Sequence, residues 1–174
     1  MSDFFLLRPS VYGQLGPRTV LDRSAHPPLV SRLHYVLDIL PNDDLHSVFP
    51  CHLVSGRLAK RLEAGKYSGA TLADLDAEMD PQLTRQHPKA SLPDMRWLQV
   101  HGVVNRDDFA VNAEGLLAVS AGVMQVLRTL QLSGCIVYNA DRPPTAEQIT
   151  DDIWEEARRV AAATRKAKKP RGHG

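Results

Sequence analysis

The segment LVSGRLAKRLEAG, residues 53–65, decides how this chain folds, because AVSAGVMQVLRTL, residues 118–130, repeats its pattern 65 positions later. Each segment begins with an apolar pair and a serine and continues with apolar residues four positions apart. Those apolar residues are Leu58 and Leu62 in the first copy and Val123 and Leu127 in the second. Residues four apart share one face of a helix. The segments therefore predict amphipathic helices near residues 56–64 and 121–131.

The similarity between the two copies continues into the residues that flank each helix. Ser55 and Ser120 favour a helix start, because a serine hydroxyl can accept a free backbone N–H at that end. An aspartate pair precedes each serine, and a Ser-Gly step follows each helix. The apolar pairs and the β-rich residues 135–138 predict strands, and Gly65 and Gly134 are candidate left-handed helix stops. The repeats cover residues 43–75 and 107–139 as strand–helix–strand units. Neither unit can bury a core alone, so we expect both to contact a shared sheet.

The rest of the chain suggests fewer elements. Strands are expected at residues 4–7 and 95–100, a turn and short helix at 41–48, and a loop at 80–94. Residues 33–40 could form a strand or a helix, because their apolar residues fit both spacings, and we favour a strand at the centre. After Pro143-Pro144, a Thr145/Gln148 capping box begins an apolar stripe with helical spacing. The stripe contains Ile149, Ile153, Trp154, Ala157, Val160 and Ala161.

We therefore expect an α+β protein. Residues 1–142 should form a single domain with a mixed sheet and the two repeated units. Residues 143–174 should form a C-terminal amphipathic helix that frays from about Ala163 into a basic, flexible tail.

Composition indicates an ordinary globular chain, with 43% apolar and 24% charged residues. No apolar run approaches the roughly 20 residues of a membrane span. The apolar run at residues 4–7 is too short for a signal-peptide core. We expect a cytoplasmic protein with no membrane association, in which Cys51 and Cys135 are reduced thiols.

The net charge of +1 conceals an asymmetry. Seven of the 21 basic residues follow Ala157, and all 20 acidic residues precede them, so the preceding part carries a net charge of −6. An acidic body makes nucleic acid an unexpected partner for a whole face of the protein. The basic tail could contact RNA, DNA or an acidic protein, but it lacks the interleaved aromatic residues of a single-strand binder.

No residue pattern predicts catalysis or a cofactor. The seven histidines lack metal-ligand spacing, so no metal is expected. Cys51 and His52 are neighbours, and neighbours on a strand point to opposite faces. We expect Cys51→Ser and His52→Ala to act through stability alone. A small cytosolic enzyme that uses Cys51 with a distant histidine such as His101 stays open as an alternative.

The aspartate pairs allow three interpretations. Asp43, Asp44, Asp107 and Asp108 could serve as acid–base groups or metal ligands, could cap turns and helices, or could present negative charge to a basic partner. We expect one aspartate of each pair to be a cap and the other to be available for a partner. Asp107 and Asp108 are the first candidates, followed by Asp43 and Asp44.

Several blocks of the chain together resemble bacterial immunity proteins. The most specific are Asp108-Phe109, Val119-Ser120 and Leu132-Ser133-Gly134. Further blocks are Pro27-Pro28, Leu33-His34-Tyr35, Asp43-Asp44-Leu45, Phe49 through Ser55, and Trp97-Leu98. The similar proteins are encoded beside polymorphic toxins and secreted antibacterial effectors, and particularly include the family first defined on a myxobacterial immunity protein. The resemblance covers residues 27–138.

This resemblance implies a function in interbacterial competition, including type VI secretion. The chain would be a cytoplasmic α+β protein, not an enzyme, that binds a cognate toxin and blocks it. The family transfers no catalytic residue to this chain, and a homodimer is compatible with the resemblance.

Overall fold

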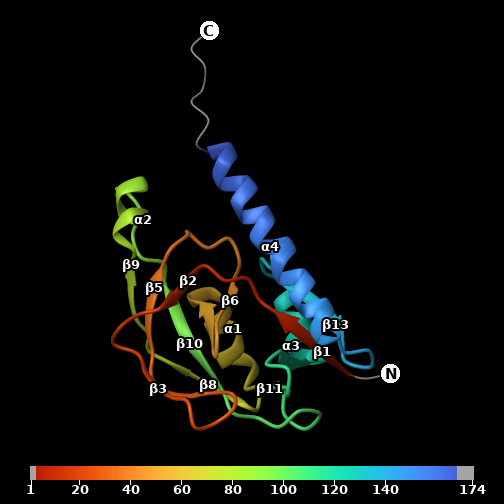
Figure 1. Ribbon diagram of the computed structural model, residues 1–174. Helices are drawn as coiled ribbons and strands as arrows, with labels where there is room; N and C mark the ends of the chain where they lie inside the picture. The colour runs from red at the N-terminus through yellow and green to blue at the C-terminus, as the bar shows by residue number, and fades with distance from the viewer. Residues whose placement is uncertain (1–2, 168–174) are drawn as a thin grey trace. The chain divides into compact units, whose positions relative to one another are not determined.

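The computed structural model describes residues 3–167, which contain four helices and thirteen strands (Figure 1). The chain divides into two compact units, Met1–Asp141 and Arg142–Gly174. The first unit, here called the body, contains all of these strands and three of the helices. The second contains helix α4 (Ala146–Ala167). The predicted α+β class is confirmed.

The first copy of the repeat forms a four-stranded antiparallel sheet with one helix. Its strands are hydrogen-bonded in the order β6-β7-β10-β8. The elements are β6 (Leu45–Val48), β7 (Cys51–Ser55), α1 (Gly56–Gly65), β8 (Ala70–Ala73) and β10 (Met95–Val100).

The second copy forms the same arrangement, with strand order β11-β12-β1-β13. Its elements are β11 (Phe109–Val111), β12 (Leu117–Ser120), α3 (Ala121–Arg128), β13 (Ile136–Asn139) and β1 (Phe4–Arg8). The strand equivalent to β10 is β1, which comes from the opposite end of the body sequence.

Strand registers show that the two sheets are equivalent residue by residue. Trp97 in β10 lies opposite Leu53 and Ala73. Leu6 in β1 lies opposite Ala118 and Tyr138, which are 65 positions after Leu53 and Ala73. The repeat is therefore a structural duplication. The expectation of a shared sheet is wrong, because each copy completes a sheet of its own.

The two sheets share one hydrophobic core, and α1 and α3 contact each other within it. Leu58 and Leu62 of α1 and Val123 and Leu127 of α3 supply the predicted apolar faces, and all four are buried. Alternate strand residues such as Val54 and Leu98 complete this core.

A second core covers the opposite face of the first sheet. Tyr35 and Leu37 pack there with Leu53 and Trp97. A three-stranded sheet of order β2-β5-β9 supplies this layer, and its β5–β9 pair is parallel. The remaining elements are β2 (Gly13–Leu15), β3 (Val20–Asp22), β4 (Leu29–Arg32), β5 (His34–Leu37), β9 (Asp76–Met79) and α2 (Pro81–Gln86).

Three local predictions need correction. Residues 45–48 form β6 instead of a helix, because they pair with β7. The expected loop at 80–94 contains α2, which Asp80 caps. The left-handed residue after α1 is Lys66, with φ of 52°, and the lack of a Cβ at Gly65 instead makes room for the Tyr67 ring.

Helix α4 begins with the predicted capping box. The Thr145 N–H donates to Gln148 Oε1 over 2.8 Å, and the Gln148 N–H donates to Thr145 Oγ1 over 3.2 Å. Residues 168–174 of the predicted tail lie outside the described part. Among residues 3–167, no helix is both long enough and apolar enough to cross a membrane.

Candidate functional site

Asp44 joins the start of α1 to the turn that follows α3. Its Oδ1 accepts a hydrogen bond from Ser55 Oγ, which in turn accepts the Leu58 N–H at the helix N-terminus. Its Oδ2 accepts the Gln131 N–H over 2.9 Å. Arg57 adds a bidentate ion pair with nitrogen–oxygen distances of 2.6 and 2.7 Å. The Asp44 side chain is therefore fully engaged in the interior, where only 2% of the residue is exposed.

These contacts also set the protonation of Asp44. Burial alone would raise the pKa of its carboxyl, but the hydrogen bonds from Arg57, Ser55 and Gln131 outweigh burial and lower the pKa below its usual value. The Asp44 carboxylate is thus ionised, is stabilised by the surrounding hydrogen-bond donors, and serves the fold.

Asp43 fastens the same turn at its far end. Its two oxygens accept the backbone N–H groups of Ser133 and Gly134, each over 2.8 Å, and the hydroxyls of Ser133 and Ser10. The residue is 4% exposed. The expectation that one aspartate of this pair is available at the surface is wrong, because both carboxylates are buried and bonded.

In the second copy, Asp108 alone bonds both the serine that caps its own helix and the turn that follows the helix of the first copy. Its Oδ1 accepts Ser120 Oγ over 2.6 Å, and that hydroxyl accepts the Val123 N–H at the start of α3. Its Oδ2 accepts the Ser68 N–H over 2.9 Å in the turn after α1. Burial tends to raise the pKa of Asp108, but the Ser120 and Ser68 hydrogen bonds lower it overall. Each copy therefore bonds the turn that follows the helix of the other copy.

Asp107 is the least enclosed of the four aspartates, with 19% of its side chain exposed. Its Oδ2 accepts the Val103 N–H over 2.8 Å and pairs with Arg106 over 3.0 Å. It closes the loop that leads into Phe109. A partner contact by Asp107 or Asp108 stays a prediction, but both carboxylates already support the local backbone.

Cys51 and His52 lie in the interior, whereas His101, the distant histidine considered as a partner for Cys51, is exposed. Burial raises the pKa of the Cys51 thiol to about 12 and lowers the pKa of His52 to about 4. Both changes oppose the thiolate–imidazolium pair that a cysteine nucleophile needs. Residues 3–167 contain no group of three or more His, Cys, Asp or Glu side chains arranged to hold a metal ion.

The thiol chemistry gives a direct prediction. At pH 8, Cys51 in a Cys135→Ser chain should react with iodoacetamide about a thousand times more slowly than an exposed thiol, because a pKa near 12 instead of 9.0 reduces the thiolate population by that factor. Mass spectrometry after timed labelling measures this rate, and labelling in urea is the control. Labelling as rapid in the native chain as in urea would show that Cys51 is accessible.

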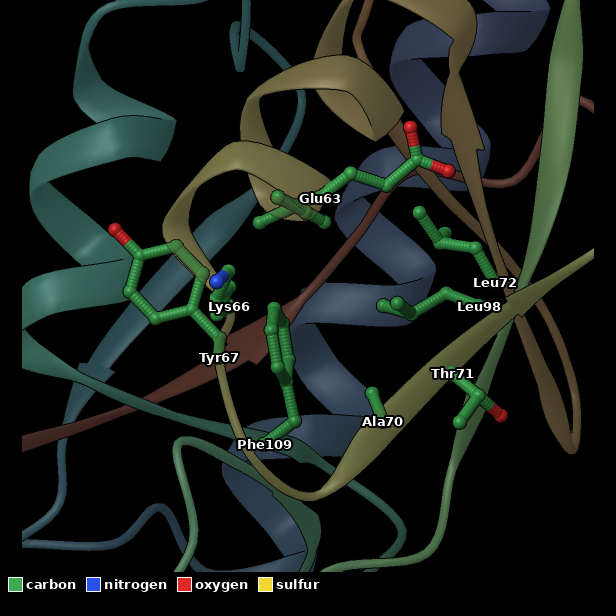
Figure 2. Close-up of a pocket in the computed structure, with 9 residues that line it drawn as sticks. Glu63, Lys66, Tyr67, Ala70, Thr71, Leu72, Leu98 and Phe109 are labelled. Carbon is green, nitrogen blue, oxygen red and sulfur yellow. The ribbon is translucent and has the colours of Figure 1, made fainter.

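An open pocket lies in the first copy, between the end of α1 and strand β8. Figure 2 shows Tyr67 and Phe109 beside its apolar interior. Its volume is about 320 Å³. Apolar groups dominate the interior, and the charged side chains of Glu63 and Lys66 are exposed at its margin. The lining residues are Leu62, Glu63, Lys66, Tyr67, Ala70, Thr71, Leu72, Leu98 and Phe109.

Asp107 and Asp108 directly precede Phe109, which lines this pocket. Asp108 holds Ser68, the neighbour of Tyr67, and the Ser68 carbonyl accepts the Phe109 N–H over 3.1 Å. The predicted residues and the pocket are thus one assembly in which the acids position the lining. Asp43 and Asp44 support the equivalent turn of the second copy instead.

The second copy differs at the equivalent positions. Leu132 stands for Tyr67, Cys135 for Ala70, and Arg128 for Glu63. The Arg128 guanidinium lies 5.2 Å from the centre of the Phe5 ring. In the first copy the equivalent pair is Glu63 and Arg96, at 3.9 Å. The small Ala70 is the sequence signal that could have indicated a pocket, but only the fold shows which residues surround it.

No protein-family model matches the chain, and no curated protein matches it in sequence. Its chemistry must therefore be inferred from its own residues.

The numbers of acidic and basic residues in the body are nearly equal. The unit Met1–Asp141 contains 15 acidic and 13 basic residues, and two of the acids are the buried Asp43 and Asp44. Five other acids belong to α4. The expected acidic surface is therefore not a property of the body.

Proposed function

We propose that this chain is a non-catalytic binding protein that neutralises a cognate bacterial toxin. The observation that carries the proposal is the contrast between the reactive groups and the open surface. Cys51, His52 and the first aspartate pair are enclosed and serve the fold, whereas the accessible concavity is apolar with charges at its margin. Such a site is suited to binding, and neither Cys51 nor a histidine lines it.

The pocket is the proposed contact for the toxin. A volume of about 320 Å³ accommodates one large apolar side chain, and aromatic or aliphatic anchors in pockets dominate the energetics of many protein interfaces. Glu63 and Lys66 would form the polar margin, where charges govern association rate and specificity. Asp108 would act as a positioning residue through Ser68. This assignment replaces the acidic surface expected from the sequence.

The test is protection of bacterial cells that express the toxin encoded next to this chain. Lys66→Glu should reduce the number of surviving cells at least tenfold and weaken binding of the purified toxin at least tenfold, about 1.4 kcal/mol, because it reverses a charge at the pocket margin. Survival counts and calorimetric titration measure the two effects.

Lys60→Glu is the matched control, because Lys60 is an exposed lysine of α1, the helix that Lys66 directly follows, and does not line the pocket. Equal losses in the two variants would contradict the pocket as the contact. Failure of the wild-type chain to bind or protect against the toxin would refute the immunity function itself.

A further inference from the structure

Helix α4 carries an exposed apolar stripe. Ile153 is 48% exposed and Trp154 is 63% exposed, and Ala157 and Ala161 continue the stripe along the same face. A tryptophan this open to water is an unusual surface feature, and helices gain most of their stability by packing such a face. The stripe therefore requires a covering partner.

Charges along one edge of the stripe indicate what that partner is. Glu147 and Asp151 precede Trp154, and Arg158 and Arg165 follow it. Spacings of four and seven residues place all four on one edge of the helix. All four are exposed. The edge is thus negative in its first half and positive in its second half.

We propose that α4 binds the α4 helix of a second copy of this chain in an antiparallel pair. An antiparallel arrangement places Glu147 and Asp151 opposite Arg165 and Arg158 of the partner, at both ends of the interface. A parallel arrangement places the two copies of this edge on opposite sides of the interface, where their charges do not pair with each other. Trp154 lies near the middle of the charged span, so the two tryptophans would cover each other's stripe.

The pair is self-complementary, as a twofold interface requires. Helix α4 has 22 residues and is therefore about 33 Å long. An interface of this length buries less surface than an obligate dimer needs, so we expect reversible association with a Kd in about the micromolar range. This inference concerns self-association and is independent of toxin binding.

Sedimentation velocity on the full chain between 1 and 300 µM tests the proposal. The wild-type chain should shift from monomer to dimer over this range, and Trp154→Glu should shift the midpoint at least tenfold higher. Leu29→Glu is the matched control, because Leu29 is exposed to the same degree, 62%, but lies in the body. Circular dichroism would verify that each variant retains its helix content.

Charge reversal tests whether the charged edge contributes to the interface. A Glu147→Lys, Asp151→Lys chain and an Arg158→Glu, Arg165→Glu chain should each remain monomeric alone and form a heterodimer when mixed, with weaker association at high salt. A wild-type chain that is monomeric throughout would overturn the proposal, even if it bound anionic lipid vesicles through α4. A dimer that tolerates both Trp154→Glu and either charge reversal would overturn it equally.

Discussion

A chain that begins at Ser10 will fail to form the body. Strand β1 lies between β12 and β13, so its removal breaks both ladders and leaves the middle of the second sheet empty. Leu7, fully buried in the common core, is lost with it. Removing one buried leucine side chain costs about 2–5 kcal/mol, and a whole domain is stable by only about 5–15 kcal/mol. Urea unfolding followed by tryptophan fluorescence should show no cooperative transition.

The duplication predicts how to repair that chain. Residues 3–9 moved to a position directly after Asp141, with residues 142–174 retained behind a flexible linker, should restore cooperative unfolding. Asn139 lies opposite Phe5 in the β13–β1 ladder, so the relocated strand would follow β13 through a four-residue hairpin loop, a common length. A relocated chain as unstructured as the truncated one would show that β1 is not equivalent to β10.

Asp44→Ala should destabilise the body by about 2–4 kcal/mol, because it removes a buried carboxylate that accepts the part-buried Gln131 N–H and Ser55 hydroxyl. Arg57→Ala is the control, because it removes only the exposed partner of Asp44 and should cost about 1 kcal/mol or less. Urea midpoints at pH 7 measure both. Equal effects would show that the ion pair with Arg57 supplies the stabilisation, and not the hydrogen bonds of Asp44 with Ser55 and Gln131.

The Asp44 carboxylate also determines whether the stability of the body rises or falls with pH. The folded pKa of Asp44 lies below its usual value, so its contribution is fully present above about pH 4 and is lost as pH falls through the folded pKa. Asp44→Asn should therefore be less stable than wild type at pH 7, and the difference should shrink at pH 3. A difference that stayed constant would show that the charge of Asp44 is not linked to folding.

Local patterns in the sequence were sufficient for the parts of this fold that are themselves local. The helix faces at Leu58 and Val123 and the serine caps depend on residues three or four positions away, so spacing alone predicts them. The placement of β1 beside β12 depends on contacts more than a hundred residues apart, and periodicity carries no information about such pairs.

The aspartates show the same limit. The sequence placed aspartates near both helix starts, but the N-caps themselves are Ser55 and Ser120. The aspartate contacts to Ser133 and Ser68 of the opposite copy exist only in the folded chain. The aspartate pairs lie 64 positions apart and the serines 65. In the first copy Asp44 bonds Ser55 and Asp43 bonds Ser133, whereas Asp108 makes both of the equivalent contacts.

The pocket was not predictable from spacing. Its lining comes from α1, the following turn, β8, β10 and β11, and the one local signal, the small Ala70, has no meaning until the fold shows which residues surround it. Charge counting was misleading for a related reason, because it assigned to the body the acids that belong to α4.

The position of β1 also determines the order in which the chain can fold during synthesis. This strand leaves the ribosome first, but both of its neighbours, β12 and β13, come from the end of the body sequence. At roughly 5–20 residues per second, β13 is translated about 6–26 s after β1. Throughout that interval Phe4 to Leu7 form an unpaired apolar segment, available to chaperones and to other nascent chains. The first sheet can assemble from consecutive segments meanwhile, so closure of the second sheet is the step that ends this exposure.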